Sequence, residues 1–269
     1  MGAHQSEGTV ICNHSLTDLV NDIHTFFSHL EKGKGNVATV GTSLTKKLSA
    51  IPLEWISILQ TCCDVLVIEA DGAKCCPLKG SAFFEPVISP CTTFLITSVG
   101  ATAFTSSLSA NEVHRPQIVS TILSKPIGSP LSVDDIASVC LSPLGHFKAL
   151  HLCAKDPSAV SVGRMNHTPD TSFVSSPSSF ICCAPATPFR TKNDIKTVFL
   201  INQADANRDL SQTLFTILRT VLFESASHPL SDSLQALNGI EMTIAAISLQ
   251  QSVVYCHTQG TISVNPTTG

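Results

Sequence analysis

The sequence has few aromatic residues, few charges and no long apolar run. Aromatic residues make up 6% of the 269 positions and charged residues 13%, whereas hydrophobic residues make up 43%. The core must therefore be mainly aliphatic, and this composition is typical of a globular protein rather than of a disordered chain. No apolar run reaches the roughly 18 residues that a membrane helix needs, so we expect no membrane span.

A basic surface and an N-terminal leader are also lacking. The formal net charge is −4, which does not give the electrostatic footprint of a protein that binds nucleic acid or an anionic membrane. The first eight residues have neither the positively charged start nor the apolar stretch of a signal peptide. We therefore expect a cytoplasmic protein without a nucleic-acid or membrane partner.

The cysteines contain no CxxC pair. There are 11, an odd number, and three pairs are adjacent: Cys62-Cys63, Cys75-Cys76 and Cys182-Cys183. Adjacent cysteines are poor disulfide partners, and free thiols suit a reducing compartment. The first two pairs could form a zinc site, but their spacing is not that of known zinc sites. We expect these cysteines to act as small buried apolar side chains.

An apolar run between acidic residues, within residues 64–70, is the strongest structural signal in the chain. Its sequence, Asp-Val-Leu-Val-Ile-Glu-Ala, is typical of a strand buried on both faces of a parallel sheet. The strand would end in Glu69 and Asp71, with Gly72 allowing a sharp exit and a close backbone approach. Acidic residues at the carboxyl end of such a strand lie where open α/β sheets bind ligands.

The residues that follow this strand suggest phosphate and metal chemistry. Asp71 is the predicted Mg²⁺ ligand, because hard cations take oxygen ligands near phosphates, and Glu69 would point to the same rim. Lys74 and Lys79 could neutralise phosphate charge. The alternative is an ordinary turn after a buried strand.

The remaining patterns predict a three-layer α/β fold. Helices and strands alternate, which is typical of a mostly parallel sheet with helices on both faces. We expect the 64–70 strand to be central, with the 197–201 strand beside it or near it. The helices are predicted over 16–30, 52–59, 116–123, 132–141 and 210–222, and the other strands over 36–40, 93–99, 240–249 and 253–255.

One domain is expected over residues 10–258, with flexible tails at 1–9 and 259–269. Residues 155–192 are rich in proline, serine and threonine and have few periodic apolar positions. This composition predicts an irregular insertion, because it offers little apolar surface to offset the entropy of ordering.

A second candidate site follows the 197–201 strand. The sequence Asn202-Gln203-Ala204-Asp205 resembles the base-reading NKxD motif of GTPases, with glutamine in place of lysine. A carboxylate at Asp205 could accept both the N1–H and the N2–H of guanine, and the Asn202 amide could donate to the base edge. The alternative is a strand-to-helix turn in which the two residues act as caps.

Several motifs together resemble one known family. They are the runs 68–74 (IEADGAK), 77–79 (PLK), 85–88 (EPVI) and 113–116 (VHRP). Over roughly residues 36–250, their order and spacing resemble the YqeC-like family of selenium-dependent hydroxylase accessory proteins. In the last motif, Arg115 could clamp an anion with two hydrogen bonds or could make a surface ion pair.

The resemblance implies a P-loop NTPase-like fold and a GTPase-like, nucleotide-binding protein. It implies Mg²⁺ and GTP or GDP as cofactors and a role in the maturation of a selenium-dependent molybdenum hydroxylase. Glu69, Lys74, Lys79 and Arg115 would then be catalytic. Asn202, Asp205 and Gly72 would contact the nucleotide, and Asp71 with Glu69 the metal.

The sequence departs from this family in one respect. The glycine-rich phosphate loop GxxxxGK[ST] is absent, and the clusters at Gly33–Gly35 and Gly41–Lys47 do not fit it. We expect either that the sequence begins after this loop or that hydrolysis is weak or lost. The alternatives to a nucleotide-binding accessory protein are a non-catalytic relative that binds a partner, and a metal-dependent enzyme that acts on a phosphorylated metabolite.

Overall fold

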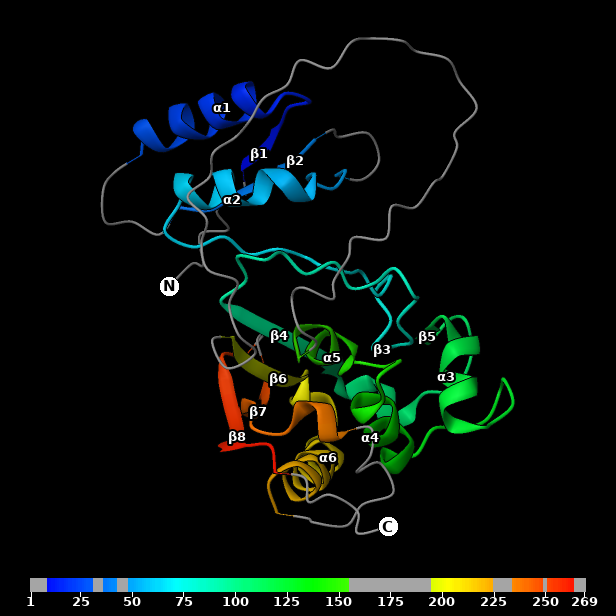
Figure 1. The fold of residues 1–269 in the computed structure, drawn as a ribbon. Coiled ribbons are helices and arrows are strands. Elements are labelled where there is room, and N and C mark those ends of the chain that lie inside the picture. The colour runs from blue at the N-terminus through cyan, green and yellow to red at the C-terminus, as the bar shows by residue number, and fades with distance from the viewer. Residues whose placement is uncertain are drawn as a thin grey trace. The chain divides into compact units, whose positions relative to one another are not determined.

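The structure, a computed structural model, describes residues 9–30, 36–42, 48–154, 195–224, 234–248 and 251–263. The chain divides into two compact units, Met1–Glu69 (unit 1) and Ala70–Gly269 (unit 2), and each is described by itself (Figure 1). This division differs from the single domain over 10–258 that the sequence predicted. The predicted insertion, 155–192, lies outside the described residues.

Unit 1 contains one strand–helix–strand motif. Strand β1 (Thr9–Cys12) pairs in parallel with β2 (Ala38–Gly41), and α1 (Leu16–Ser28) lies between them in the sequence. Ser15 caps α1 by accepting a hydrogen bond from the backbone N–H of Asp18. The unit continues with η1 (Leu53–Trp55), α2 (Ile56–Leu59) and η2 (Gln60–Cys62). Its core consists of Ile11, Leu19, Ile23 and Leu59.

The predicted central strand at 64–70 does not form. The segment has no regular secondary structure, and Val65 and Val67 are 77% and 84% exposed. A buried strand needs neighbouring strands to bind its backbone N–H and C=O groups, and the described residues provide none here. The prediction that this segment shares a sheet with 197–201 was therefore wrong.

A four-stranded sheet forms the centre of unit 2. The strand order is β4 (Phe94–Gly100), β6 (Lys196–Asn202), β7 (Glu241–Ser248) and β8 (Val253–Thr261). The first three strands are parallel, and β8 runs antiparallel to β7. The carboxyl ends of β4 and β6 are in register, with Gly100 opposite Asn202.

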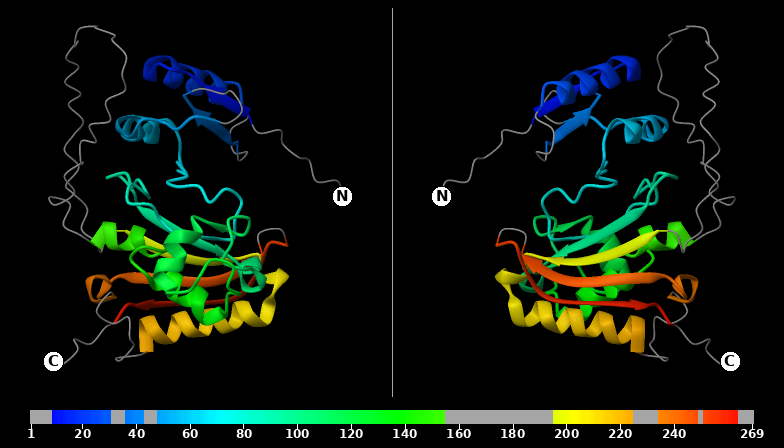
Figure 2. Two further views of the ribbon diagram at one scale, coloured as in Figure 1. Left: turned by 90° about the vertical axis from the view of Figure 1, so that its right-hand side faces the viewer. Right: turned by 90° about the vertical axis from the view of Figure 1, so that its left-hand side faces the viewer.

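The helices of unit 2 confirm most of the sequence-based prediction. They are α3 (Pro116–Leu123), α4 (Val133–Leu141), α5 (Lys148–Ala154) and α6 (Arg208–Arg219), with short turns at η3 (Ala101–Thr105), η6 (Ala204–Ala206), η7 (Thr220–Glu224) and η8 (Gln235–Leu237). Helix α6 packs along β7 and against α4 (Figure 2). Helix α5 was not predicted.

The side chains of the sheet show which face is covered. Val99, Phe199 and Ile244 are at most 1% exposed and belong to the main core. On the opposite face of β4, Phe94 and Ile96 are 56% and 60% exposed. The chain is thus a mixed α/β protein with mainly parallel sheets, and over β4 the described residues do not provide the second helical layer that we predicted.

Two short parallel strands complete unit 2. Strand β3 (Leu78–Lys79) pairs with β5 (Val113–His114), so that Lys79 lies opposite His114. Among the residues that the structure describes, no helix is long and apolar enough to cross a membrane.

Candidate functional site

Lys79 is a buried cation with three close oxygen partners. The residue is 5% exposed. Its Nζ lies 2.9 Å from Asp71 Oδ2 and 3.0 Å from Glu85 Oε2, and it donates to the carbonyl oxygen of Gly72 at 3.1 Å. Two of these contacts are hydrogen bonds, and the third, with Asp71, is an ion pair. The two carboxylates offset the cost of removing its charge from water.

Glu85 joins Lys79 to Arg115. Arg115 donates from Nη1 to Glu85 Oε2 at 2.6 Å and from Nη2 to Oε1 at 2.7 Å, which is the two-bond geometry of a guanidinium on a carboxylate. Burial alone raises the pKa of Glu85. The hydrogen bonds and positive charges of Arg115 and Lys79 outweigh this effect and lower the pKa to about 2. Glu85 is therefore ionised at neutral pH.

The loop that follows β3 is fixed to the loop before α5 by several hydrogen bonds. Ser81 donates from its backbone N to Leu144 O at 3.0 Å and from Oγ to Gly145 O at 3.2 Å. The Nζ of Lys148 donates to Ala82 O. Burial lowers the pKa of Lys148, and nearby carboxylates oppose this shift. The loop is thus fixed at Ser81 and Ala82 before its tip, and at Glu85 after it.

Two histidines lie beside this charged cluster. Burial is the main cause that lowers the pKa of His146 to about 4; Lys79 also lowers it, whereas Asp71 opposes the shift. The Nε2 of His146 is buried and has no hydrogen-bond partner among the described residues. The pKa of His114 is lowered by burial and by the charges of Arg115, Lys79 and other cations. Both rings are therefore neutral at pH 7.

The motif Asn202–Asp205 lies at the carboxyl end of β6, as predicted. Asn202 Oδ1 accepts a hydrogen bond from the backbone N of Gln203 at 2.8 Å. Asp205 is exposed in the η6 turn before α6, and its Oδ2 accepts from Gln251 Nε2 at 3.4 Å. Tyr255 in turn donates from its hydroxyl to Gln251 Oε1 at 3.1 Å.

The motifs selected from the sequence converge at the end of β4. Gly100, the last residue of β4, donates from its N to Pro77 O at 2.9 Å. A Cβ on Gly100 would lie 2.9 Å from Pro77 Cβ and 3.3 Å from Gln203 Oε1. Glycine is thus required where these two chain segments approach the strand. The segment that contains Lys79 and the loop after β6 therefore share one edge of the sheet.

Unfavourable backbone conformations also concentrate in these motifs. Six non-glycine residues with positive φ occur in the described part of the chain, and four lie here: Lys74 (51°), Cys75 (61°), Arg115 (57°) and Gln203 (56°). Such conformations cost roughly 1 kcal/mol or more each and cluster at functional sites. Their distribution therefore supports a site at this edge of unit 2.

The predicted site residues fall into three groups. Four belong to the charged cluster, in which Asp71 and Gly72 contact Lys79, and Lys79 and Arg115 contact Glu85. Asn202 and Asp205 lie at the end of β6. The third group joins neither: Lys74 is exposed and has no salt bridge to a described residue, and Glu69 is exposed and belongs to unit 1. The roles that we assigned to all eight residues remain predictions.

Sequence reasoning missed three members of the cluster, namely Glu85, His146 and Lys148. Glu85 lies in the EPVI motif, so the motif marked the position without revealing its partners. His146 and Lys148 lie in a stretch without a motif, and only the fold brings them to the loop after β3.

The predicted metal ligands do not form a dedicated metal-binding cluster. No group of three or more His, Cys, Asp or Glu side chains that could hold a metal ion occurs in the described part of the chain. One oxygen of Asp71 is engaged by Lys79. These residues do not fit a metal held by the protein alone.

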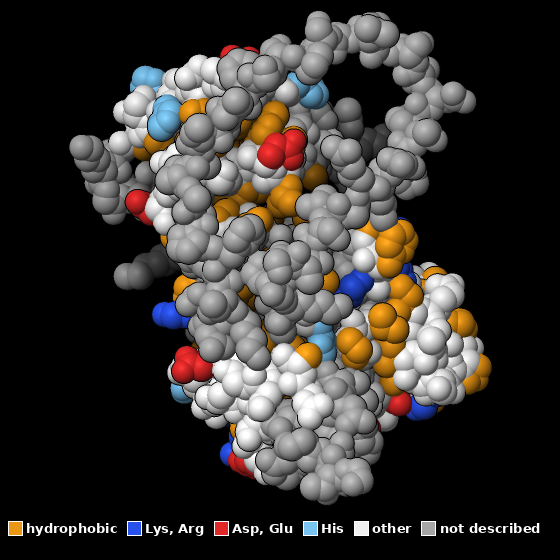
Figure 3. Space-filling view, viewed as in Figure 1, with side chains coloured by type: hydrophobic (Ala, Val, Ile, Leu, Met, Phe, Trp, Pro, Cys, Tyr) orange, Lys and Arg blue, Asp and Glu red, His pale blue; other side chains and the backbone are white. Residues whose placement is uncertain are grey.

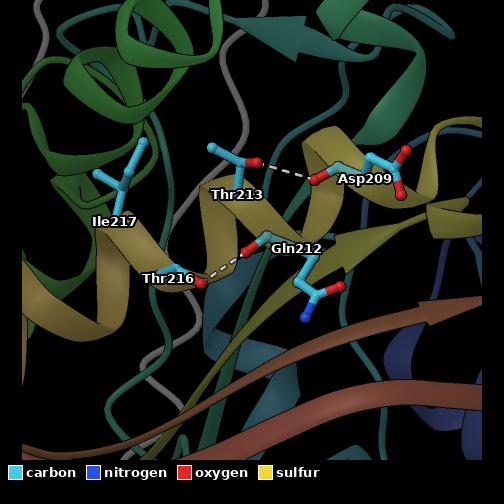
Figure 4. A pocket seen from close by; sticks show the side chains of 5 residues that line it. All are labelled: Asp209, Gln212, Thr213, Thr216 and Ile217. Carbon is cyan, nitrogen blue, oxygen red and sulfur yellow. Dashed lines mark hydrogen bonds between the residues drawn. The ribbon is translucent and has the colours of Figure 1, made fainter.

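A shallow depression on α6 has no comparable chemistry. Its lining comes from this one helix: Asp209, Gln212, Thr213, Thr216 and Ile217 (Figure 4). Thr213 donates to the carbonyl oxygen of Asp209 and Thr216 to that of Gln212, each at 2.9 Å. Since both hydroxyls bond within the helix, the depression is not a candidate site.

The fold and the cluster together define an α/β protein with a charged site at the carboxyl edge of a parallel sheet. Residues 8–117 match the family model described as YqeC protein. This match includes the motifs from IEADGAK to VHRP and ends before Asn202–Asp205. Over these residues the chain is similar to the YqeC family, as the motifs predicted.

One curated relative supports this assignment. It is "Uncharacterized protein YqeC" of Escherichia coli (strain K12), which is 31% identical over 86 residues. The alignment covers 32% of this chain and 34% of the relative, so it spans about a third of the curated protein. No solved structure matches the chain.

Proposed function

We propose that the protein binds a guanine nucleotide at the carboxyl edge of the unit 2 sheet. We further propose that it acts in the cytoplasm as an accessory protein in the maturation of a selenium-dependent molybdenum hydroxylase. One observation carries the nucleotide proposal: the loop Asn202–Asp205 follows the inner parallel strand β6 and contacts the end of β4 beside Pro77. Ligands of open α/β sheets bind at this edge.

The polar groups of the loop are suited to guanine. Asn202 Oδ1 is used by the backbone N–H of Gln203, which leaves the amide N–H donors for acceptors on a base. The exposed carboxylate of Asp205 can accept the two N–H donors of guanine, whereas adenine presents no equivalent pair. Guanine should therefore bind more tightly than adenine.

Phosphate and metal binding would depend on the remaining cations and on Asp71. Lys74 is exposed and has no ion pair with a described residue, so it is the most available cation for a phosphate. A Mg²⁺ ion bound to nucleotide phosphates needs only one or two protein carboxylates, and Asp71 would supply one. Without the GxxxxGK[ST] loop, binding should be weak and hydrolysis weak or lost.

Calorimetry with GDP and ADP in magnesium buffer tests the base preference. In Asp205→Asn the loss of base pairing should weaken GDP binding by about 1–3 kcal/mol and abolish the preference. Asp209→Asn is the matched control, because Asp209 is also exposed and lies in the first turn of α6, directly after the η6 turn that contains Asp205. Equal affinities of the unmodified protein for both nucleotides would refute the proposal.

The accessory role requires a separate test. Selenium-dependent molybdenum hydroxylase activity should fall in cells that lack the protein, and the unmodified gene should restore it. Failure of Asp205→Asn to restore activity would link this role to the nucleotide site. The third possibility, a metal-dependent enzyme acting on a phosphorylated metabolite, has less support, because the described residues contain no three-ligand cluster.

A further inference from the structure

The loop after β3 displays two aromatic side chains to solvent. Phe83 and Phe84 are 79% and 52% exposed, and their rings lie edge to face with centroids 5.1 Å apart. Val87 (49%) and Leu144 (48%) are exposed nearby in the chain and on the adjoining loop. Large apolar side chains grouped on a surface mark interaction sites, whereas single ones need no explanation.

This aromatic loop is fixed by buried contacts rather than being a loose turn. Glu85, the next residue, is held by Arg115 and Lys79, and Ala82, the preceding one, accepts from Lys148. The fold therefore uses a buried charge network to hold a short loop whose tip is apolar. Pre-organisation of this kind lowers the entropy cost of binding, and aromatic anchors carry much of the energy of protein interfaces.

The charge around the aromatic pair is positive. The guanidinium carbon of Arg115 lies 5.8 Å from the centre of the Phe84 ring. Lys74 is exposed, and its charge reaches His114, the neighbour of Arg115. The two carboxylates of the cluster, Glu85 and Asp71, are already paired with Lys79 and Arg115. In Figure 3, hydrophobic side chains and Lys or Arg side chains gather together over the region of β3, β5 and α3.

We propose that Phe83 and Phe84 form a docking surface for a partner-protein segment that carries apolar side chains flanked by carboxylates. The apolar groups would pack on the two rings, and the carboxylates would face Lys74 and the exposed part of Arg115. The positive rim disfavours a second copy of the same surface, because it would place like charges opposite each other. This proposal does not require nucleotide binding, although Lys74 is assigned to both, so the peptide tests are made without nucleotide.

Binding to synthetic peptides tests this surface directly. The probe is a short peptide of alternating leucine and glutamate, compared with peptides in which lysine or serine replaces glutamate. The full chain should bind the glutamate peptide about tenfold more tightly than the lysine peptide, and added salt should reduce this difference. Phe83→Ser combined with Phe84→Ser should weaken binding about tenfold or more.

Two matched variants serve as controls. Ile127→Ser removes an apolar side chain that is also 52% exposed, but between α3 and α4, and it should leave binding unchanged. Lys74→Ala should weaken binding of the glutamate peptide, whereas Lys196→Ala, at the opposite end of β6, should not. All five substituted residues (Phe83, Phe84, Ile127, Lys74 and Lys196) are exposed and lie outside the buried charge network, so the thermal midpoint should stay constant.

Other results would overturn the proposal. Equal affinity for the glutamate and lysine peptides would show that charge does not select the partner segment. Unchanged binding after loss of both rings would show that Phe83 and Phe84 do not form the docking surface. Binding to phosphatidylserine vesicles without peptide binding would assign the loop to a membrane instead. Self-association in sedimentation that is lost with the two rings would assign it to a second copy.

Discussion

Glu85 binds Arg115 through both carboxylate oxygens, at 2.6 and 2.7 Å, although 30 positions separate the two residues in the chain. The same carboxylate holds Lys79, so one acidic side chain connects β3, the aromatic loop and the residue before α3. Its side chain is 16% exposed and that of Lys79 is 6% exposed. Removing this charge would leave two cations without their shared partner.

Glu85→Gln should therefore destabilise unit 2 by about 3 kcal/mol, the cost of breaking a buried ion pair from one side. Glu241→Gln, at the exposed start of β7, should change the free energy of unfolding by less than about 0.5 kcal/mol. Urea unfolding followed by the fluorescence of Tyr255, the single tyrosine, would measure this difference in stability. The experiment is done in a Trp55→Phe background, because the single tryptophan lies in unit 1 and would otherwise dominate the signal. Equal effects of both substitutions would contradict the network.

Acid should destabilise unit 2 in two successive pH ranges. The pKa of His146 falls from 6.5 to about 4 on folding, so between these values the unfolded chain binds a proton that the folded chain does not. The free energy of unfolding therefore decreases as the pH falls through this range, by at most about 1.4 kcal/mol per pH unit. The pKa of Glu85 falls from 4.5 to about 2, which continues the loss below pH 4.5.

His146→Asn separates the two contributions. It should flatten the dependence of stability on pH between about 6.5 and 4, and it should leave the decline below pH 4.5 in place. Thermal midpoints measured across pH 3–7 would show this. A slope between pH 6.5 and 4 that is identical in both proteins would assign it to other groups.

The N-terminus of α4 depends on Asp135. This side chain accepts from Lys125 Nζ at 2.6 Å and from the backbone N and the hydroxyl of Ser132, each at 2.8 Å, and Ser132 Oγ accepts from Asp135 N in return. Asp135→Ala should cost about 2 kcal/mol, because it removes a capping box and leaves Lys125 without its partner. The exposed neighbour Asp134 is in the same turn, and its replacement by alanine should cost less than about 0.5 kcal/mol. Urea unfolding of the two variants checks the difference, and similar losses would refute it.

Gln251 should compete with a nucleotide base for Asp205. Its amide donates to the carboxylate that we assign to guanine, so a base must displace it. If the protein binds a guanine nucleotide as proposed, Gln251→Ala should raise the affinity for GDP about two- to fivefold. The base would then no longer have to break the exposed hydrogen bond between Gln251 and Asp205. ADP binding, measured by the same calorimetry, should not change. Weaker GDP binding in this variant would show that Gln251 contacts the nucleotide instead.

The sequence predicted those helices and strands that have a regular apolar pattern of their own and capping or turn residues at their ends. The helices at α1, α3, α4 and α6 and the strands β4, β6 and β7 appear near the expected positions. Short elements without a regular pattern of apolar residues, such as β3, β5 and α5, were missed. A mostly parallel sheet was predicted from the alternation of strands and helices, and β4, β6 and β7 do pair in parallel.

The segment 64–70 shows the limit of this reasoning. Its composition predicted a strand buried on both faces, but burial requires partners that the sequence of the segment does not specify. The charged cluster could not be derived either, because its residues come from widely separated positions, including 71, 85 and 115. Motif resemblance marked three of these positions, and the fold supplied the contacts between them.

The open side of β4 affects how the protein behaves in concentrated solution. Within the described part of the chain, β4 pairs with β6 on one side and has no strand on the other, where Gly100 at its end is bonded to Pro77. Its sequence from Phe94 to Gly100 contains no charge and no proline, and Phe94 and Ile96 are exposed beside this edge. Natural sheets usually protect such an edge with lysine, proline or a bulge, because an unprotected one recruits strands from other molecules. The purified protein should therefore aggregate through β4, and Ile96→Lys should slow this aggregation.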